Sequence, residues 1–219
     1  MLINYIFFDL DDTLYPSSAG LWDAIGDRIN LYMVERLKLP PGEVTALRDH
    51  YLQAHGTTLN GLVREHGIEP DDYLAYVHDL PLEAHIHPSP ALTDMLERLP
   101  QYKIVLTNAD LAHAQRVLAR LGLQSHFDAI VDIRALNWVN KPEPKAYRRA
   151  MELAGAKEPG ECMLIEDSIR NLRAARALGM LGVYVGAQDP GDDADFVLRD
   201  ISELTRVVPG LLNGDILKH

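Results

Sequence analysis

The segment INYIFFD, Ile3–Asp9, is a near-continuous apolar run that ends in an acidic residue. Such a run is typical of a strand that is buried on both faces, as the strands of parallel sheets are. Asp11, Asp12 and Thr13 follow almost at once. The first element is therefore predicted to be a core strand that leads directly into a group of carboxylates.

After residue 82, short apolar runs alternate with amphipathic helical patterns. This alternation is typical of an α/β fold, and it predicts a Rossmann-like, doubly wound parallel sheet. The further predicted strands lie at 103–106, 129–133, 163–165 and 181–185, and the predicted helices lie near 91–98, 111–121, 143–154, 169–178 and 200–212.

Between residues 17 and 81 the hydrophobic spacing is helical instead. Apolar residues recur at three- and four-residue steps, as at Leu21, Ile25 and Ile29, and Pro- and Gly-containing breaks predict about four short helices. We therefore expect a Rossmann-like core formed by residues 1–16 and 82–219, with a helical cap domain, residues 17–81, inserted after the first strand.

Composition and charge argue against a protein that binds nucleic acid or spans a membrane. The chain has 32 acidic residues against 21 Lys and Arg, a net charge of -11, and 47% hydrophobic residues. No useful basic patch offsets this charge, so we expect a small-molecule substrate or a protein partner and no nucleic acid. No stretch reaches the roughly 20 apolar residues of a membrane span, and Cys162 is the single cysteine. We expect a soluble, cytoplasmic protein; the sequence does not indicate its oligomeric state.

Polar residues follow the ends of the predicted strands. Ligands of open parallel sheets bind at the carboxyl ends of the strands, so these side chains are expected to converge on one edge. They are Asp9 and Asp11 after the first strand, Thr107 and Asn108 after the second, Glu166 and Asp167 after the fourth, and Lys141 before the helix near 143.

The closely spaced acids Asp9, Asp11 and Asp12 would repel one another unless they share a cation or a proton. Hard oxygen ligands without His or Cys favour magnesium (Mg2+), which is held by a few carboxylates, waters and substrate phosphate oxygens. The alternative is an acidic helix N-cap at Asp12 or Thr13. We expect Mg2+ as the cofactor.

Four short motifs occur in the order that haloacid dehalogenase-like (HAD) phosphatases have, and the chain resembles that superfamily. The resemblance implies that Asp9 is a nucleophile that becomes an aspartyl-phosphate, and that Asp11 is the general acid and base. It also implies that Asp167 ligates the metal together with Asp9 and the backbone carbonyl of Asp11. The motifs are DLDDTL at 9–14, TN at 107–108, KP at 141–142 and EDS at 166–168.

The spacing of Asp9 and Asp11 suits this chemistry, because residues i and i+2 of an extended segment point the same way and both carboxylates reach one phosphorus. Thr107 and Asn108 are expected to donate to phosphate oxygens, and Lys141 to offset negative charge. The alternatives are a strand-end turn for Thr107 and Asn108, and a solvated surface position for Lys141.

The chain departs from the family pattern after Asp167, where many relatives carry a second acid and this chain has Asn171. Glu166 is one source of the missing charge, so we expect Glu166 either near the metal or as the partner of Lys141. By resemblance, dehalogenases need no acid at the place of Asp11. Its presence therefore favours phosphoryl transfer over dehalogenation.

More of the chain resembles one branch, the pyrimidine 5′-nucleotidases. The resemblance implies hydrolysis of UMP, CMP or another small nucleoside monophosphate, with the cap selecting the substrate. It makes Thr57 and Thr58 candidates for base or ribose contact, although either is equally well placed to cap a helix. The alternatives are another capped phosphatase or a phosphomutase acting on sugar phosphates, and a phosphate-ester-binding protein without turnover. The matching stretches are 7–16, 47–63, 141–147 and 165–180.

Overall fold

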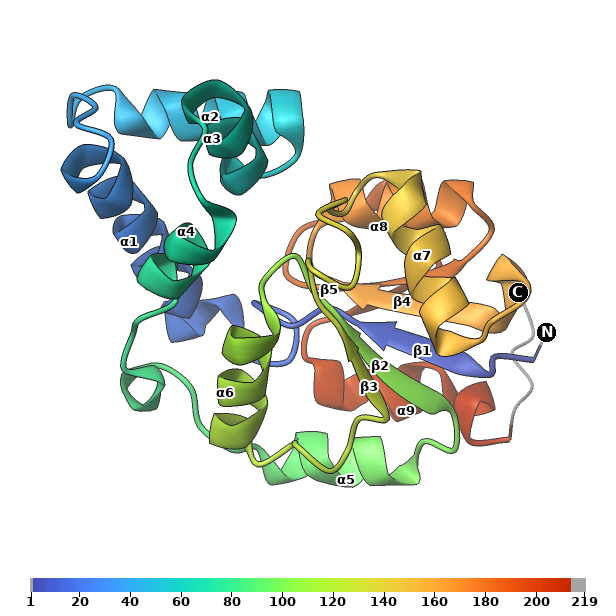
Figure 1. Ribbon diagram of the computed structural model, residues 1–219. Coiled ribbons are helices and arrows are strands. Elements are labelled where there is room, and N and C mark those ends of the chain that lie inside the picture. Colours follow the sequence, from blue (N-terminus) through green and yellow to red (C-terminus); the bar gives the residue numbers. More distant parts are fainter. Residues whose placement is uncertain (1, 214–219) are drawn as a thin grey trace. The chain divides into compact units, whose positions relative to one another are not determined.

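The structure is a computed structural model that describes residues 2–213 (Figure 1). Contacts between residues divide the chain into two compact units. The first, here called the sheet unit, consists of the residues up to Ser17 and those from Ile86 onward. The second, the helical unit, is Ser18–His85.

A parallel sheet with a strand-order reversal is the centre of the sheet unit. Within the described residues it has six strands in the order β3-β2-β1-β4-β5-β6, and every neighbouring pair is parallel. This confirms the predicted α/β fold with a doubly wound sheet. The strands are β1 (Tyr5–Phe8), β2 (Tyr102–Leu106), β3 (Ala129–Val131), β4 (Cys162–Glu166), β5 (Leu181–Val185) and β6 (Phe196–Leu198).

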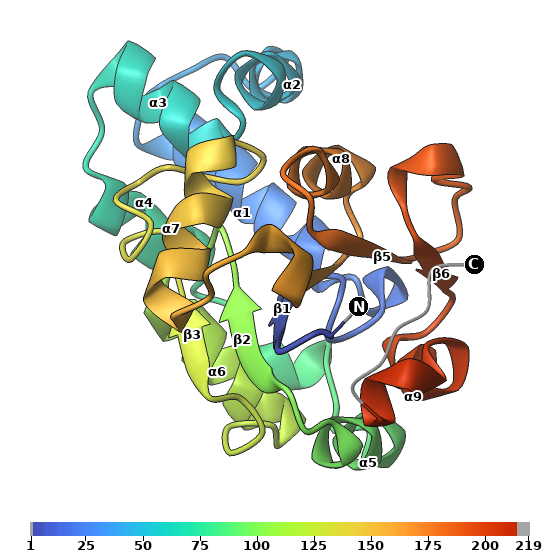
Figure 2. The same ribbon diagram turned by 90° about the vertical axis from the view of Figure 1, so that its right-hand side faces the viewer.

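Helices cover both faces of this sheet (Figures 1 and 2). On one face lie α7 (Pro144–Ala154) and α8 (Ile169–Ala177); on the other lie α5 (Pro90–Arg98), α6 (Leu111–Leu121) and α9 (Leu204–Val207). Because both faces are covered, the central strand is fully enclosed: Ile6, Phe7 and Phe8 are 0% exposed. Short 3-10 helices connect these elements at Pro159–Glu161, Gly191–Asp193, Ile201–Glu203 and Pro209–Leu212.

The helical unit is built from α-helices. Their apolar residues recur at helical spacing, and the buried members of that pattern form the core of the unit, for example Leu21, Ile25 and Tyr51. Gly61 packs so close to Tyr51 that an added Cβ would lie 2.4 Å from its ring. The helices are α1 (Leu21–Glu35), α2 (Val44–His55), α3 (Thr58–His66) and α4 (Pro70–Val77), with 3-10 helices at Leu82–Ala84 and, preceding α1 across the unit boundary, Ser17–Ala19.

Two local predictions differ from the structure. Strand β6 was not predicted. It is a three-residue edge strand, FVL, that follows the acidic segment 189–195, and its middle residue, Val197, is 44% exposed. The helix predicted near 200–212 is broken into short pieces, and Pro209, which cannot donate a backbone hydrogen bond, begins the last of them. No helix within residues 2–213 is both long and apolar enough to span a bilayer.

Candidate active site

The strand register brings residues distant in sequence to one edge of the sheet. Phe8 pairs with Ile165 and with Val105, so the residues that follow β1, β2 and β4 lie at the same level. The N–H of Asp9 continues the ladder by donating to the carbonyl of Ile165 at 2.9 Å. The predicted convergence of polar side chains thus follows from strand pairing around the strand-order reversal.

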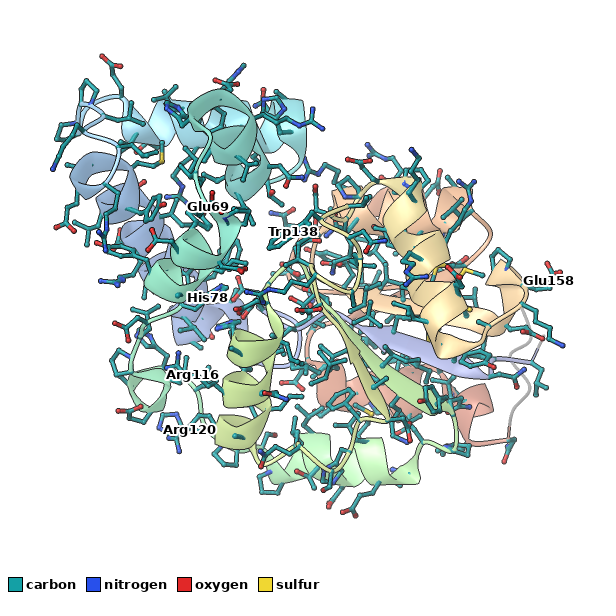
Figure 3. The ribbon with its side chains drawn as sticks, viewed as in Figure 1. Glu69, His78, Arg116, Arg120, Trp138 and Glu158 are labelled. Carbon is teal, nitrogen blue, oxygen red and sulfur yellow. The ribbon has the colours of Figure 1, made fainter. Side chains whose placement is uncertain are left out.

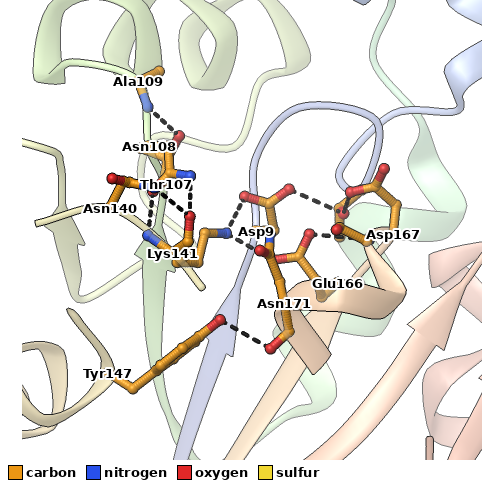
Figure 4. Close-up of polar contacts among 12 residues, drawn as sticks. Asp9, Thr107, Asn108, Ala109, Asn140, Lys141, Tyr147, Glu166, Asp167 and Asn171 are labelled. Carbon is orange, nitrogen blue, oxygen red and sulfur yellow. Dashed lines mark hydrogen bonds and ion pairs between the residues drawn. The ribbon is translucent and has the colours of Figure 1, made fainter. Parts of the chain in front are cut away.

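Lys141 is the cation of this edge and is almost completely buried, with 1% of its surface exposed. Its Nζ donates to Asp9 Oδ1 at 2.6 Å and to Glu166 Oε2 at 2.7 Å (Figure 4). Burial alone would lower the pKa of this ammonium, but the charges of Asp9 and Glu166 outweigh it, so the pKa lies above its ordinary value. Lys141 is therefore a buried, charged residue and not the solvated surface lysine of the alternative interpretation.

Three carboxylates gather around this lysine. Among the described residues, Asp9, Glu166 and Asp167 each offer an oxygen within 4.8 Å of the others. Burial, reinforced by Glu166, raises the pKa of Asp9 to about 7. Burial, reinforced by Asp9, raises the pKa of Asp167 to about 7, and burial also raises the pKa of Glu166. One lysine does not balance three acids, so the cluster favours a further positive charge.

The donor set of this cluster fits a hard divalent cation. All three side chains offer carboxylate oxygens, which are the ligands that Mg2+ prefers, and no histidine or cysteine belongs to the group. The Thr13 hydroxyl lies between two of them, 3.4 Å from Asp9 Oδ2 and 3.2 Å from Asp167 Oδ1. The Thr13 hydroxyl therefore bridges the side chains of Asp9 and Asp167.

Asp11 is held by two side chains that the sequence analysis did not single out. Its Oδ1 accepts a hydrogen bond from the Tyr15 hydroxyl at 2.7 Å and lies 2.8 Å from His113 Nε2. Tyr15 is four residues beyond Asp11, directly after the first motif, whereas His113 comes from α6. The sequence does contain a signal for the contact between His113 and Asp11. This signal is a histidine in the first turn of the helix that follows the second motif.

Asn108 contacts the backbone of Lys141 with both ends of its amide. Its Oδ1 accepts from the Lys141 N–H at 2.8 Å, and its Nδ2 donates to the Lys141 carbonyl at 3.1 Å. Asn140 donates to the same carbonyl at 2.8 Å. Thr107 is buried, and its Oγ1 accepts from the Ala109 N–H at 2.9 Å, which leaves the hydroxyl hydrogen to donate. Asn108 thus positions Lys141, and Thr107 retains a hydrogen for a ligand.

The remaining predicted residues lie in or next to helices, and their proposed roles in the site stay predictions. Asn171 is buried in α8, its Oδ1 has no hydrogen-bond partner within residues 2–213, and its carbonyl accepts from the Tyr147 hydroxyl at 2.9 Å. Thr57 caps α3 in the helical unit by accepting from the Asn60 N–H at 3.1 Å. Thr58 is the first residue of that helix. A substrate contact for Thr57 or Thr58 stays a prediction.

The fold and this edge define a class of α/β proteins that carry an acidic cluster and a lysine at the carboxyl ends of the central strands. The family model of haloacid dehalogenase-like hydrolases matches residues 3–179, so the chain belongs to that family.

Similar proteins come from yeast, an archaeon and a bacterium. The chain is 28% identical over 190 residues to "Phosphate metabolism protein 8" of Saccharomyces cerevisiae, a match that covers 80% of this chain but only 59% of that longer protein. It is 29% identical to "Glyceraldehyde 3-phosphate phosphatase" of Methanopyrus kandleri, over 94% of this chain and 97% of the relative. The magnesium-bound HAD hydrolase YfnB of Bacillus subtilis has the same fold, with a TM-score of 0.66, 15% identity and coverage of 95% and 100%.

Proposed function

We propose that this protein is a magnesium-dependent phosphomonoesterase that acts on small phosphorylated metabolites through an aspartyl-phosphate on Asp9. The observation that carries the proposal is the buried arrangement of Asp9, Lys141 and the neighbouring carboxylates at the carboxyl edge. Family membership and the phosphatase name of the archaeal relative support it. In this account the sheet unit is the catalytic core and the helical unit is the cap.

Asp9 is the nucleophile in this proposal. One of its carboxylate oxygens attacks phosphorus, the ester P–O bond breaks, and the leaving oxygen takes a proton from Asp11. Water then attacks the phosphorus of the aspartyl-phosphate while the Asp11 carboxylate accepts its proton, and the bond between Asp9 and phosphorus breaks to release phosphate. The two carboxylates therefore serve both steps.

Lys141 supplies fixed positive charge in both steps. Its ammonium bonds Asp9 Oδ1 directly, so it orients the nucleophile and favours the ionised carboxylate. The hydrogen of the Thr107 hydroxyl is available for a phosphate oxygen. Asn108 contributes by fixing the backbone of Lys141, which keeps the ammonium beside Asp9.

The residues proposed to hold Mg2+ are Asp9, Asp167 and the backbone carbonyl of Asp11, with Glu166 as a further carboxylate of the cluster. When bound, the ion neutralises negative charge on the phosphoryl group and the acids. Glu166 already bonds Lys141 through Oε2 and accepts the Ser168 N–H through Oε1 at 3.2 Å. These contacts support the role of Glu166 as the partner of Lys141, and its place in the cluster supports the role near the metal.

The substrate proposed is a nucleoside monophosphate, most specifically UMP or CMP. The basis is the resemblance of residues 7–16, 47–63, 141–147 and 165–180 to pyrimidine 5′-nucleotidases. A sugar or triose phosphate is the second candidate, because the archaeal relative that matches almost its whole length is named a glyceraldehyde 3-phosphate phosphatase. Both candidates are small phosphate monoesters that use the same chemistry at Asp9.

Phosphate release from a panel of substrates tests the proposal. The panel contains UMP, CMP, purine monophosphates, glyceraldehyde 3-phosphate and hexose phosphates, each with Mg2+ and with EDTA. We expect Mg2+-dependent turnover that is fastest for UMP or CMP, lost in Asp9→Asn and retained in the control Asp94→Asn, whose side chain is exposed on α5. Equal release by wild type and Asp9→Asn would contradict the proposal, whereas a preference for a sugar phosphate would overturn only the substrate assignment.

A further inference from the structure

Two buried side chains hold one oxygen of Asp11. The His113 ring is 1% exposed and Tyr15 is 4% exposed, and both contact Oδ1 of Asp11, at 2.8 and 2.7 Å. They come from different parts of the sheet unit, one from α6 and one from the segment after β1. A carboxylate bonded from two such directions is restricted in rotation about its side-chain bonds.

The chemistry of the three groups fixes which atoms donate. An ionised carboxylate only accepts hydrogen bonds, so the Tyr15 hydroxyl and the His113 Nε2–H are the donors when Asp11 is ionised. Bonds of this charge-assisted kind are short and strong. When Asp11 is protonated on Oδ2, Oδ1 is a carbonyl oxygen that accepts the same two bonds. The contact is therefore compatible with both protonation states.

The position of His113 follows from the start of α6. Asp110 caps this helix by accepting from the His113 N–H at 3.1 Å, so the ring is anchored in the first turn. His113 belongs to the buried face of α6. On the same helix, Arg116 is exposed and Arg120 is half-buried (Figure 3). A histidine packed inward from the first turn reaches the loop after β1.

We propose that His113 and Tyr15 are positioning residues that hold the Asp11 carboxylate in one orientation through its Oδ1. This role rests on the proposed function, in which Asp11 is the general acid and base. With two donors on Oδ1, the carboxylate keeps this orientation during both proton transfers. Asp11 then gives a proton to the leaving group and later takes one from water.

The dependence on the leaving group separates this role from a merely structural one. An alkyl phosphate releases a basic alkoxide that needs a proton from Asp11, whereas p-nitrophenyl phosphate releases a stable phenolate that does not. The ratio kcat/KM reports the steps up to formation of the aspartyl-phosphate. A misplaced Asp11 therefore lowers kcat/KM for the alkyl ester selectively, while a general loss of structure lowers it for both substrates.

The test measures kcat/KM of wild type, His113→Leu, His113→Gln and Tyr15→Phe on p-nitrophenyl phosphate and on the best alkyl ester of the panel. For His113→Leu and Tyr15→Phe we expect a loss of about 10- to 100-fold on the alkyl ester and only a few-fold on the aryl ester. His113→Gln keeps an N–H near the place of Nε2 and should recover much of the loss. The control is Tyr5→Phe, since the Tyr5 hydroxyl bonds the Gly155 carbonyl instead.

Equal losses on the two esters, or no loss on either, would overturn the positioning role. If His113→Leu does not fold, the test uses the other two variants. Tyr15→Phe removes one donor to Asp11, and His113→Gln replaces the other donor by an amide N–H. Absence of turnover by wild type on both esters would instead overturn the proposed function. The two failures are thus distinguishable.

Discussion

Lys141 Nζ lies 2.6 Å from Asp9 Oδ1 although 132 positions separate the two residues in the chain. The ion pair is buried and shares its lysine with Glu166 at 2.7 Å. A buried cation that serves two acids is costly to remove, since the acids then lose their compensating charge. The pair therefore links the stability of the sheet unit to its proposed chemistry.

Lys141→Met is the first prediction. The variant leaves the buried acids without their cation, so it should unfold more easily by about 3–5 kcal/mol at pH 8 and lose turnover. The penalty should shrink at pH 5, because Asp9 and Asp167, with pKa values of about 7, are then protonated. Urea unfolding at both pH values checks this, with Lys145→Met as the exposed control. An equal penalty at pH 5 and pH 8 would contradict it.

Asp167→Asn tests the acid cluster without removing a partner of Lys141. The pKa of Asp167 is about 7 in the folded protein against an ordinary value of 3.8, so the folded state binds the proton more tightly. Raising the pH from about 4 to 7 therefore destabilises the metal-free protein through this group. At pH 8 with EDTA we expect Asp167→Asn to be more stable than wild type by about 1–4 kcal/mol, and no such gain at pH 4.

Thermal unfolding of both proteins measures this difference. Mg2+ should raise the Tm of wild type at pH 8 more than at pH 5, since it competes with protons for the same oxygens. Mg2+ should change the Tm of Asp167→Asn only slightly. Asp94→Asn on α5 is the control. If Asp167→Asn is less stable than wild type at pH 8 with EDTA, the acids of the cluster do not destabilise the folded state by repelling one another.

Asn108→Ala distinguishes two roles of that amide. Both of its ends bond the backbone of Lys141, so the variant should lose about 1–3 kcal/mol of stability and lower kcat through a displaced ammonium. The sequence predicts instead a bond from Asn108 to the phosphate, whose loss would mainly raise KM. Unchanged stability with a raised KM would therefore favour phosphate binding over positioning.

Gly61→Ala tests the packing of the helical unit. Alanine favours a helix by about 1 kcal/mol over glycine, so propensity alone predicts stabilisation. The new Cβ would lie 2.4 Å from the Tyr51 ring, however, and Tyr51 is 1% exposed. We expect a net loss of about 1–3 kcal/mol in chemical unfolding. The control is Gly42→Ala, where nothing lies within 4 Å of the new atom, and a stabilised Gly61→Ala would show that α2 and α3 pack loosely.

Much of the fold could be predicted because its signals are local. The apolar runs of β1, β4 and β5 mark strands enclosed on both faces, and the helices between them show clear periodicity. The signal of the edge strand β6 is weaker, because its apolar run is only three residues long and follows an acidic segment. Pro209 interrupts the helix predicted near 200–212, although Ile201, Leu204 and Val208 recur at helical spacing.

The site could be predicted as a set of residues but not as a set of contacts. The order of the motifs identified Asp9, Lys141 and Asp167, since each follows or precedes a recognisable element. The bond from Asn108 to the backbone of Lys141 and that from His113 to Asp11 depend on how loops from different strands approach one another. Sequence spacing alone does not fix such approaches across separations of 33 and 102 positions, although a histidine early in the helix after the second motif points to the contact with Asp11.

Rapid acid quenching during turnover tests whether Asp9 carries the phosphoryl group. Wild-type protein is mixed with the best substrate and Mg2+, quenched during turnover, digested and examined by mass spectrometry. The account predicts one phosphoryl group on the peptide that contains Asp9, labile to hydroxylamine and missing in Asp9→Asn. Turnover that proceeds while no peptide gains a phosphoryl group, or a phosphoryl group on another residue that persists in Asp9→Asn, would contradict it.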